Sequence, residues 1–146
     1  MEIRRARPAD APSLYETRLR ALGSDDRFED ADAFRQTMLE GDAPPSLYMA
    51  HDGDDVLGFS AADPQTGRIL GVWVDPEVAG RGLGTALLRH AEWAATQEGV
   101  DELRVECSPD AASFFEENRY RRDEGASGEQ VVLTKHVPDP TQDGEL

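Results

Sequence analysis

Alternating glycines followed by a helical pattern form the part of this chain best suited to binding a charged ligand. The glycines are Gly80, Gly82 and Gly84. They follow an apolar run at residues 69–74 and precede apolar residues at helical spacing from Leu83 onward. The first turn of a helix has free N–H groups and a partial positive charge, and glycines let an anion approach the main chain. Since Arg81 adds a donor suited to phosphate oxygens, the stretch predicts a phosphate-binding loop.

Two common phosphate-binding motifs do not fit this loop. A Rossmann fingerprint reads Gly-x-Gly-x-x-Gly and a P-loop ends in Gly-Lys-Ser/Thr, whereas here no lysine follows the glycines. The loop instead resembles the acetyl-CoA loop of the GNAT superfamily of N-acyltransferases, which reads Gln/Arg-x-x-Gly-x-Gly/Ala. Gly82 and Gly84 match its two small positions, and Ala79 stands where the family has Gln or Arg. The resemblance implies that main-chain N–H groups, which make most of the family's pyrophosphate contacts, make them here.

A second segment adds to the resemblance. Residues 105–120, V-E-C-S-P-D-A-A-S-F-F-E-E-N-R-Y, are similar to the family pattern V-x-x-[N/S]-x-x-A-x-x-F-Y-E-x-x-G-F. Residues 3–10 also look like many family N-termini, so the resemblance covers residues 3–136. It implies that acetyl-CoA lies between the fourth and fifth strands and that a primary amine attacks its thioester directly. The cofactor-binding residues implied in this way are Val72, Trp73, Val74, Gly80, Arg81, Gly82, Leu83, Gly84, Thr85, Ser108 and Phe115.

The residues for proton transfer depart from the family pattern. Phe115 stands where many members have a tyrosine that protonates the leaving sulfur, and the favoured base positions align with Arg68 and Leu70. Glu106 is the replacement base that we name, acting through water, and its alternative role is that of a solvated strand acid. Tyr120 also carries a hydroxyl, but it aligns with an aromatic core residue of the family.

Other reactive side chains have simpler structural interpretations. Cys107 alternates with the apolar residues of 103–105, which predicts a buried thiol rather than a nucleophile. Trp73 either lines the acyl pocket or fills the core. The histidines show no grouping typical of metal ligands, so no metal is expected; they are His51, His90 and His136.

The elements that position these residues alternate along the chain. A strand is expected at Glu2–Ala6, followed by a helix that Asp10 caps and a second helix capped by Ser24 or Asp25. Three strands lead into the glycine loop. The loop's helix, a strand, a helix capped by Ser108 and two more strands follow. This is the α/β GNAT order, β-α-α-β-β-β-α-β-α-β-β, with a mixed six- to seven-stranded sheet and about four helices.

The acidic composition limits the partners and the location of the protein. The chain has 30 acidic and 15 basic residues, a net charge of −15, and a single lysine, Lys135. Such a surface disfavours nucleic acid and anionic membranes as partners and is typical of adaptation to high salt. The single cysteine excludes an internal disulfide and, with no apolar run of membrane-spanning length, favours a cytoplasmic protein. We expect residues 1–137 to form one domain and residues 138–146 a flexible acidic tail, with a homodimer left open.

Two alternatives to an acetyl-CoA-dependent N-acyltransferase remain open from the residues alone. Because Phe115 cannot donate a proton and no base is evident, the chain also fits an acyl-CoA-binding sensor without turnover. A binder of another phosphate ligand, such as a nucleotide, is the second alternative. For the enzyme, the expected acceptor is a small-molecule or peptide amine.

Overall fold

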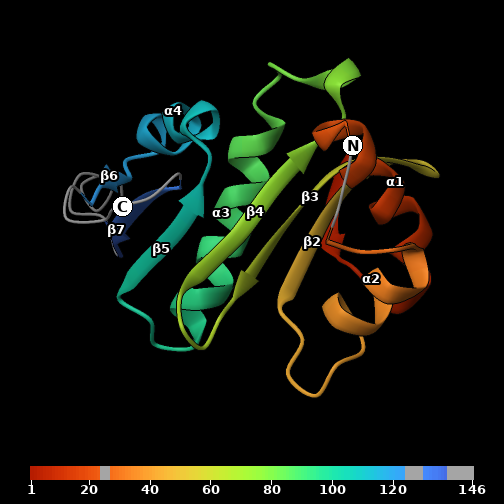
Figure 1. Cartoon of the computed structure of the whole chain (residues 1–146), viewed down its shortest axis with the longest axis horizontal. Coiled ribbons are helices and arrows are strands. Elements are labelled where there is room, and N and C mark those ends of the chain that lie inside the picture. Colours follow the sequence, from red (N-terminus) through yellow and green to blue (C-terminus); the bar gives the residue numbers. More distant parts are fainter. Residues whose placement is uncertain (24–26, 124–129, 138–146) are drawn as a thin grey trace. The chain divides into compact units, whose positions relative to one another are not determined.

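The described helices and strands follow the order expected from the sequence (Figure 1). The structure is a computed structural model that describes residues 1–23, 27–123 and 130–137. Its strands are β1 (Glu2–Arg5), β2 (Ser46–Asp52), β3 (Asp55–Asp63), β4 (Arg68–Val74), β5 (Glu102–Cys107), β6 (Arg121–Arg122) and β7 (Val131–His136). Its helices are α1 (Ala11–Leu22), α2 (Ala31–Met38), α3 (Leu83–Gln97) and α4 (Pro109–Glu117), with short 3-10 turns η1 (Pro8–Asp10) and η2 (Pro76–Val78). The described strands form a mixed seven-stranded sheet in the order β1-β2-β3-β4-β5-β7-β6, which confirms the predicted fold class.

Within this order the chain divides into two compact units. Unit 1 comprises Met1–Ala61 and Val72–Ala91, and unit 2 comprises Ala62–Gly71 and the described residues from Glu92 onward. The chain passes between the units within β3, within β4 and within α3. The expected tail, residues 138–146, lies outside the described residues.

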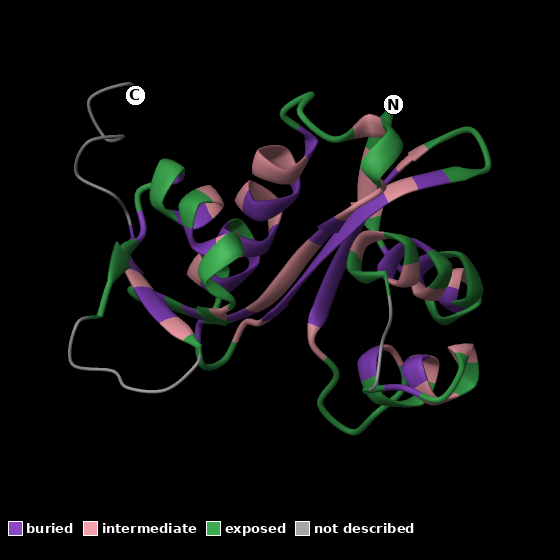
Figure 2. Cartoon of the chain, turned by 45° about the horizontal axis from the view of Figure 1, so that its top comes forward, coloured by how far each residue is buried: buried purple, intermediate pink, exposed green. Residues whose placement is uncertain are grey.

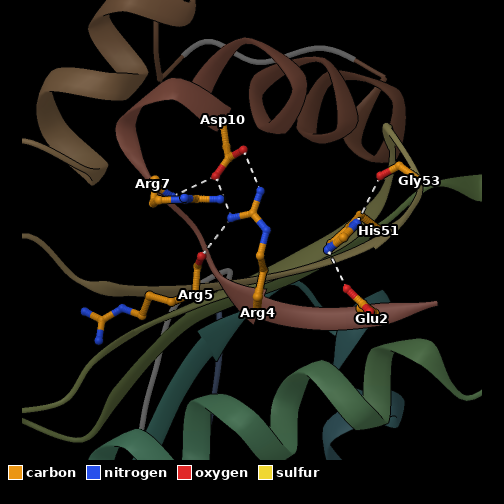
Figure 3. A network of polar contacts seen from close by, with 7 residues as sticks. All are labelled: Glu2, Arg4, Arg5, Arg7, Asp10, His51 and Gly53. Atoms are coloured by element: carbon orange, nitrogen blue, oxygen red, sulfur yellow. Dashed lines mark hydrogen bonds and ion pairs between the residues drawn. The ribbon is translucent and has the colours of Figure 1, made fainter.

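In unit 1, a polar network fixes the first strand and the turn into α1 (Figure 3). The Asp10 carboxylate accepts two hydrogen bonds from the Arg4 guanidinium, at 3.0 and 2.9 Å, and one from the Arg7 main-chain N–H, at 2.8 Å. The hydrogen bonds from Arg4 lower the pKa of Asp10. Asp10 occupies the N-cap position of α1, as predicted, but its side chain makes no capping hydrogen bond, because this carboxylate is bonded to groups that precede the helix.

The second helix of unit 1 starts later than the apolar spacing indicates. The Asp30 carboxylate caps α2 by accepting a 2.8 Å hydrogen bond from the N–H three residues later. The expectation of a cap at Ser24 or Asp25 is therefore wrong, and those two residues lie outside the described part of the chain. Phe28 precedes the helix and packs edge-on against Phe34, with 5.3 Å between ring centroids. Phe28 falls at helical spacing from Phe34 because both rings pack in the core. The helix itself begins only after Asp30, whose backbone is extended.

β2 and β3 are the most deeply buried strands of unit 1, as Figure 2 shows by their purple colour. Successive residues of a strand point to opposite faces of the sheet. The ring of Phe59 meets Phe34 of α2 at 5.9 Å, and the hydroxyl of Ser60 donates to the Leu87 carbonyl of α3 at 2.9 Å. The central strand is thus covered by helices on both faces.

Unit 2 has an alternating strand, β5, and a helix, α4, packed against it. Leu103 and Val105 are buried, whereas Glu102, Arg104 and Glu106, which alternate with them, are exposed. α4 contacts β5 and β7, and β5 pairs antiparallel with β7 along its whole length. Ser108 occupies the position before α4, but its side chain makes no capping hydrogen bond, so that prediction is wrong. Pro109 at the first helical position and a 3.0 Å bond from the Ala111 N–H to the Ser108 carbonyl start the helix instead.

Candidate functional site

The glycine loop of unit 1 starts from a turn held by Asp75. The Asp75 N–H donates to the Leu57 carbonyl of β3 at 2.8 Å, and its Oδ1 accepts from the Glu77 N–H at 3.0 Å. Its Oδ2 accepts a 3.1 Å hydrogen bond from Nε of Arg20 on α1. The first residue of the loop is therefore fixed by both a strand and a helix of unit 1. In the sequence, Asp75 followed by proline indicates only the end of a strand.

Two of the loop's glycines have backbone angles that other residues rarely adopt. Gly80 has φ +83° and Gly82 has φ +79°. A Cβ built at either position would meet no atom within 4 Å. Residues 79–82 are exposed. Glycine is thus required here by the backbone conformation, and the main chain around it is open to an approaching ligand.

The helix that follows starts at this open loop. The Ala86 N–H donates to the Gly82 carbonyl at 3.2 Å, which is the first bond of the α3 ladder. The N–H groups of residues 83–85 therefore have no acceptor inside the helix. Leu83 is buried and anchors the helix start in the core of unit 1. With the partial positive charge of a helix N-terminus, this arrangement can bind a phosphate group.

The strand before the loop supports α3 on one face and an aromatic cluster on the other. Val72 and Val74 pack against the buried start of α3. Trp73 points away from them and stacks on Phe59, with 4.7 Å between ring centroids. The guanidinium of Arg18, on α1, lies 4.8 Å from the Trp73 ring centroid. The Trp73 side chain, 9% exposed, thus belongs to the core of unit 1.

Unit 2 contains the three remaining predicted site residues. Ser108 and Glu106 are exposed, and Oε1 of Glu106 lies 3.4 Å from Nη2 of Arg104. Phe115 is buried, and its ring is edge-on to Phe114 at 5.1 Å and to Tyr120 at 5.5 Å. Within unit 2, the ring at the family's usual acid position is therefore held between two aromatic neighbours.

Tyr120 and Cys107 of unit 2 also carry acidic protons, and the surroundings of both side chains favour structural roles. The Tyr120 hydroxyl donates to Oε2 of Glu92 at 2.8 Å, and the residue is buried, which confirms its interpretation as a core residue. Cys107 is half-buried rather than buried as predicted, and this partial burial raises the pKa of its thiol. A raised pKa disfavours the thiolate, so Cys107 is poorly suited to act as a nucleophile.

Each histidine has a local partner. Nδ1 of His51 lies 3.0 Å from the Gly53 carbonyl, and its Nε2 lies 3.7 Å from Glu2 (Figure 3). His90 bonds the Ala86 carbonyl of its own helix, and His136 lies 3.6 Å from Glu102. Among the described residues, no group of three or more His, Cys, Asp or Glu side chains is placed to hold a metal ion. None of the described helices has both the length and the apolar composition needed to cross a membrane.

Sequence reasoning missed a buried polar cluster in unit 2. Nζ of Lys135 lies 3.3 and 3.1 Å from the two carboxylate oxygens of Glu92, and both side chains are almost fully buried. One signal was available. Lys135 falls two residues after Leu133 on β7, so strand alternation places it on the same, buried face.

Comparison with known families identifies one match that spans most of the chain. The sequence model of the acetyltransferase (GNAT) family matches residues 11–119. No curated protein sequence matches the chain.

Solved structures with the same fold are similar to nearly the whole chain. A GCN5-related N-acetyltransferase from Rhodopseudomonas palustris is 23% identical, with a TM-score of 0.72 over 93% of this chain and 95% of that one. The PaiA N-acetyltransferase from Thermoplasma acidophilum, in complex with coenzyme A, is 17% identical, with a TM-score of 0.71 over 93% and 98%. The ribosomal-protein-S18-alanine N-acetyltransferase from Escherichia coli is 17% identical, with a TM-score of 0.73 over 93% of each chain. At these identities the likeness shows a common fold.

Proposed function

Because the chain belongs to the acetyltransferase (GNAT) family, we propose that it is an acetyl-CoA-dependent N-acyltransferase. The acceptor is a primary amine of a small molecule or a peptide. Its neutral nitrogen attacks the thioester carbonyl, so that a C–N bond forms, the C–S bond breaks and CoA leaves as a thiolate. The amine loses one proton in the process, and the thiolate gains one.

The start of α3 carries this proposal. The exposed main chain of residues 79–82 and the N–H groups of residues 83–85, which have no acceptor within the helix, form a site for the pyrophosphate of CoA. Arg81 is exposed beside these N–H groups and supplies a guanidinium for a phosphate oxygen. Ala79, where the family has Gln or Arg, removes one side chain and leaves the main-chain donors intact.

The short pairing between β4 and β5 supports the proposed place of the cofactor's arm. Two residue pairs form the ladder that joins these described strands, Arg68 with Arg104 and Ile69 with Val105. The next residues of β4 in unit 2, Leu70 and Gly71, are outside that ladder. Strand main-chain groups need a partner, and the amides of a pantetheine arm are suitable partners. The similar PaiA structure was solved with coenzyme A.

Few side chains of the protein take part in the proposed proton transfers. We assign Glu106 as the residue that accepts the amine proton through water, since its carboxylate is exposed. Phe115 has no proton to give, so the thiolate takes its proton from solvent. Binding and orientation then supply most of the rate, because holding the amine against the thioester removes the entropic cost of their encounter.

A charge change at Gly84 tests the loop directly. Gly84→Asp places a carboxylate in the first turn of α3, where it suits the helix dipole but repels a pyrophosphate. We expect CoA affinity, measured by titration calorimetry, to fall by about 100-fold, or roughly 2.7 kcal/mol. Gly84→Asn has the same shape without the charge and is the matched control, for which we expect a much smaller loss. Equal affinities of the two variants would contradict the assignment of the loop.

The acyl-CoA-binding sensor is the second candidate function, and Phe115 is the observation that favours it. Release of free thiol from acetyl-CoA, measured with a broad panel of amines, distinguishes the N-acyltransferase from the sensor. CoA binding without turnover across the panel would favour the sensor.

A nucleotide-binding module is tested by thermal shift with acetyl-CoA, ATP and NAD, since a ligand at 100 times its Kd stabilises the folded protein by about 2.7 kcal/mol.

A further inference from the structure

A buried polar cluster joins three elements of unit 2. We define it as Glu92 of α3, Tyr120 after α4 and Lys135 of β7. The lysine Nζ lies within 3.3 Å of both carboxylate oxygens of Glu92, and the tyrosine hydroxyl donates to one of them at 2.8 Å. The Lys135 Nζ also lies 5.5 Å from the centroid of the Tyr120 ring. All three residues are at least nine-tenths buried.

The cluster is bonded to the end of α4. Nζ of Lys135 donates to the Asn118 carbonyl at 3.2 Å, and the Tyr120 N–H donates to the Phe115 carbonyl at 3.0 Å. The Tyr120 ring also packs edge-on against the Phe115 ring. The cluster therefore contacts Phe115 through both its main chain and its side chain.

The turn between these contacts has a strained backbone. Arg119, between Asn118 and Tyr120, has φ +75°, the one described non-glycine residue with a positive φ. Side chains other than glycine adopt this region at a cost in free energy, and such residues persist where their surroundings fix the conformation. The contacts of Lys135 and Tyr120 on either side of Arg119 supply that fixation.

The chemistry of the cluster favours a role in geometry over one in stability. Burying two charges removes their hydration, and well-packed apolar residues in place of a buried ion pair often leave a protein as stable or more so. A directional pair nevertheless specifies one arrangement of the elements that it joins, which apolar contacts do less well.

We propose that Glu92, Tyr120 and Lys135 are positioning residues that fix the end of α4 and thereby hold Phe115 and Ser108 in place for acyl-CoA. The proposal rests on the proposed function for its ligand. Its structural part, the fixing of α4 by the cluster, stands on the contacts within unit 2.

The test replaces all three residues with apolar ones, so that neither Glu92 nor Lys135 is left buried without the other. The variant combines Glu92→Leu, Tyr120→Phe and Lys135→Met. We expect its thermal midpoint to be unchanged or raised. Amide hydrogen exchange should become faster by about tenfold in α4 and stay unchanged in β5. CoA should bind about tenfold more weakly. Arg122→Gln, which removes an exposed ion pair between Glu116 of α4 and β6, is the control and should change none of these.

Two results would overturn the proposal. The first is unchanged α4 exchange and CoA affinity in the apolar variant, which would show that the cluster positions nothing. The second is a fall in thermal midpoint with faster exchange in β5 and α4 alike, which would make the cluster a general support of unit 2. If the unaltered protein does not bind CoA, the proposed function fails, and α4 exchange still decides whether the cluster fixes the helix.

Discussion

The predicted site residues of unit 1 and those of unit 2 differ in their chemistry. Unit 1 offers main-chain N–H groups at an open glycine loop, and its side chains there mainly pack the helix start. Unit 2 offers side chains, and at the family's acid position it has a phenyl ring held between aromatic neighbours. Both units depart from the family pattern, unit 1 at Ala79 and unit 2 at Phe115, but only the departure at Phe115 removes a group proposed for proton transfer.

The contrast between main-chain donors in unit 1 and side chains in unit 2 indicates which substitutions each part tolerates. A pyrophosphate bound by main-chain N–H groups depends on backbone conformation, so Ala79 in place of Gln or Arg removes little. Proton transfer to the leaving sulfur depends on one hydroxyl group, which the Phe115 side chain lacks. Under the proposed function, cofactor binding depends on the glycine positions, whereas the rate of the chemistry depends on a few replaceable side chains.

The largest contrast between the units concerns their ion pairs. Lys135→Met removes the cation that faces the buried Glu92 carboxylate, so we expect a loss of about 3–5 kcal/mol in the free energy of unfolding. Arg4→Met breaks the partly exposed pair with Asp10 in unit 1 and should cost only about 1 kcal/mol or less. Urea unfolding followed by circular dichroism measures both. Similar losses would show that the burial of the unit 2 pair has no energetic consequence.

A hydroxyl placed at position 115 of unit 2 tests whether the missing acid limits kcat. If sulfur protonation limits turnover, Phe115→Tyr should raise kcat by about tenfold, equivalent to roughly 1.4 kcal/mol of barrier. Phe114→Tyr adds the same hydroxyl one residue earlier on α4 and should leave kcat unchanged. An unchanged kcat for Phe115→Tyr would mean that the leaving thiolate needs no donor from the protein.

The smallest expected effect is at the strained residue of unit 2. Arg119→Gly should raise the free energy of unfolding by about 1 kcal/mol, because the left-handed region costs an L-residue roughly 1–2 kcal/mol and the freedom of glycine in the unfolded chain offsets part of that gain. Arg121→Ala, at a nearby exposed position, should change it by less than about 0.5 kcal/mol. Urea unfolding resolves the two, and a destabilised Arg119→Gly would show that the arginine side chain contributes more than the strain costs.

The elements around the glycine loop could be predicted from local patterns. β4 has the expected limits, Arg68–Val74, because a glycine turn precedes it and Asp75 with Pro76 ends it. α3 starts at Leu83, directly after Gly82, and closes at Gln97, before Gly99. Such limits depend on residues adjacent in the chain, which a sequence pattern records.

The missed features depend on contacts between distant residues. Asp10 and Ser108 have the residue type and position of helix caps, yet the Asp10 carboxylate is taken by Arg4 and Arg7, and Ser108 makes no capping bond. The bond between Arg20 and Asp75 joins residues 55 positions apart. The ion pair of Glu92 and Lys135 likewise joins residues 43 positions apart. Local periodicity records none of these contacts, because it contains no information about which elements meet.

The burial of Lys135 has a practical consequence for an enzyme proposed to modify amines. It is the only lysine of the chain, and its side chain is 2% exposed and paired with Glu92. The folded protein therefore presents no ε-amino group to its own acyl donor or to amine-reactive dyes and crosslinkers. Acyl transfer onto added peptides can then be followed by intact mass without a background of self-modification at lysine.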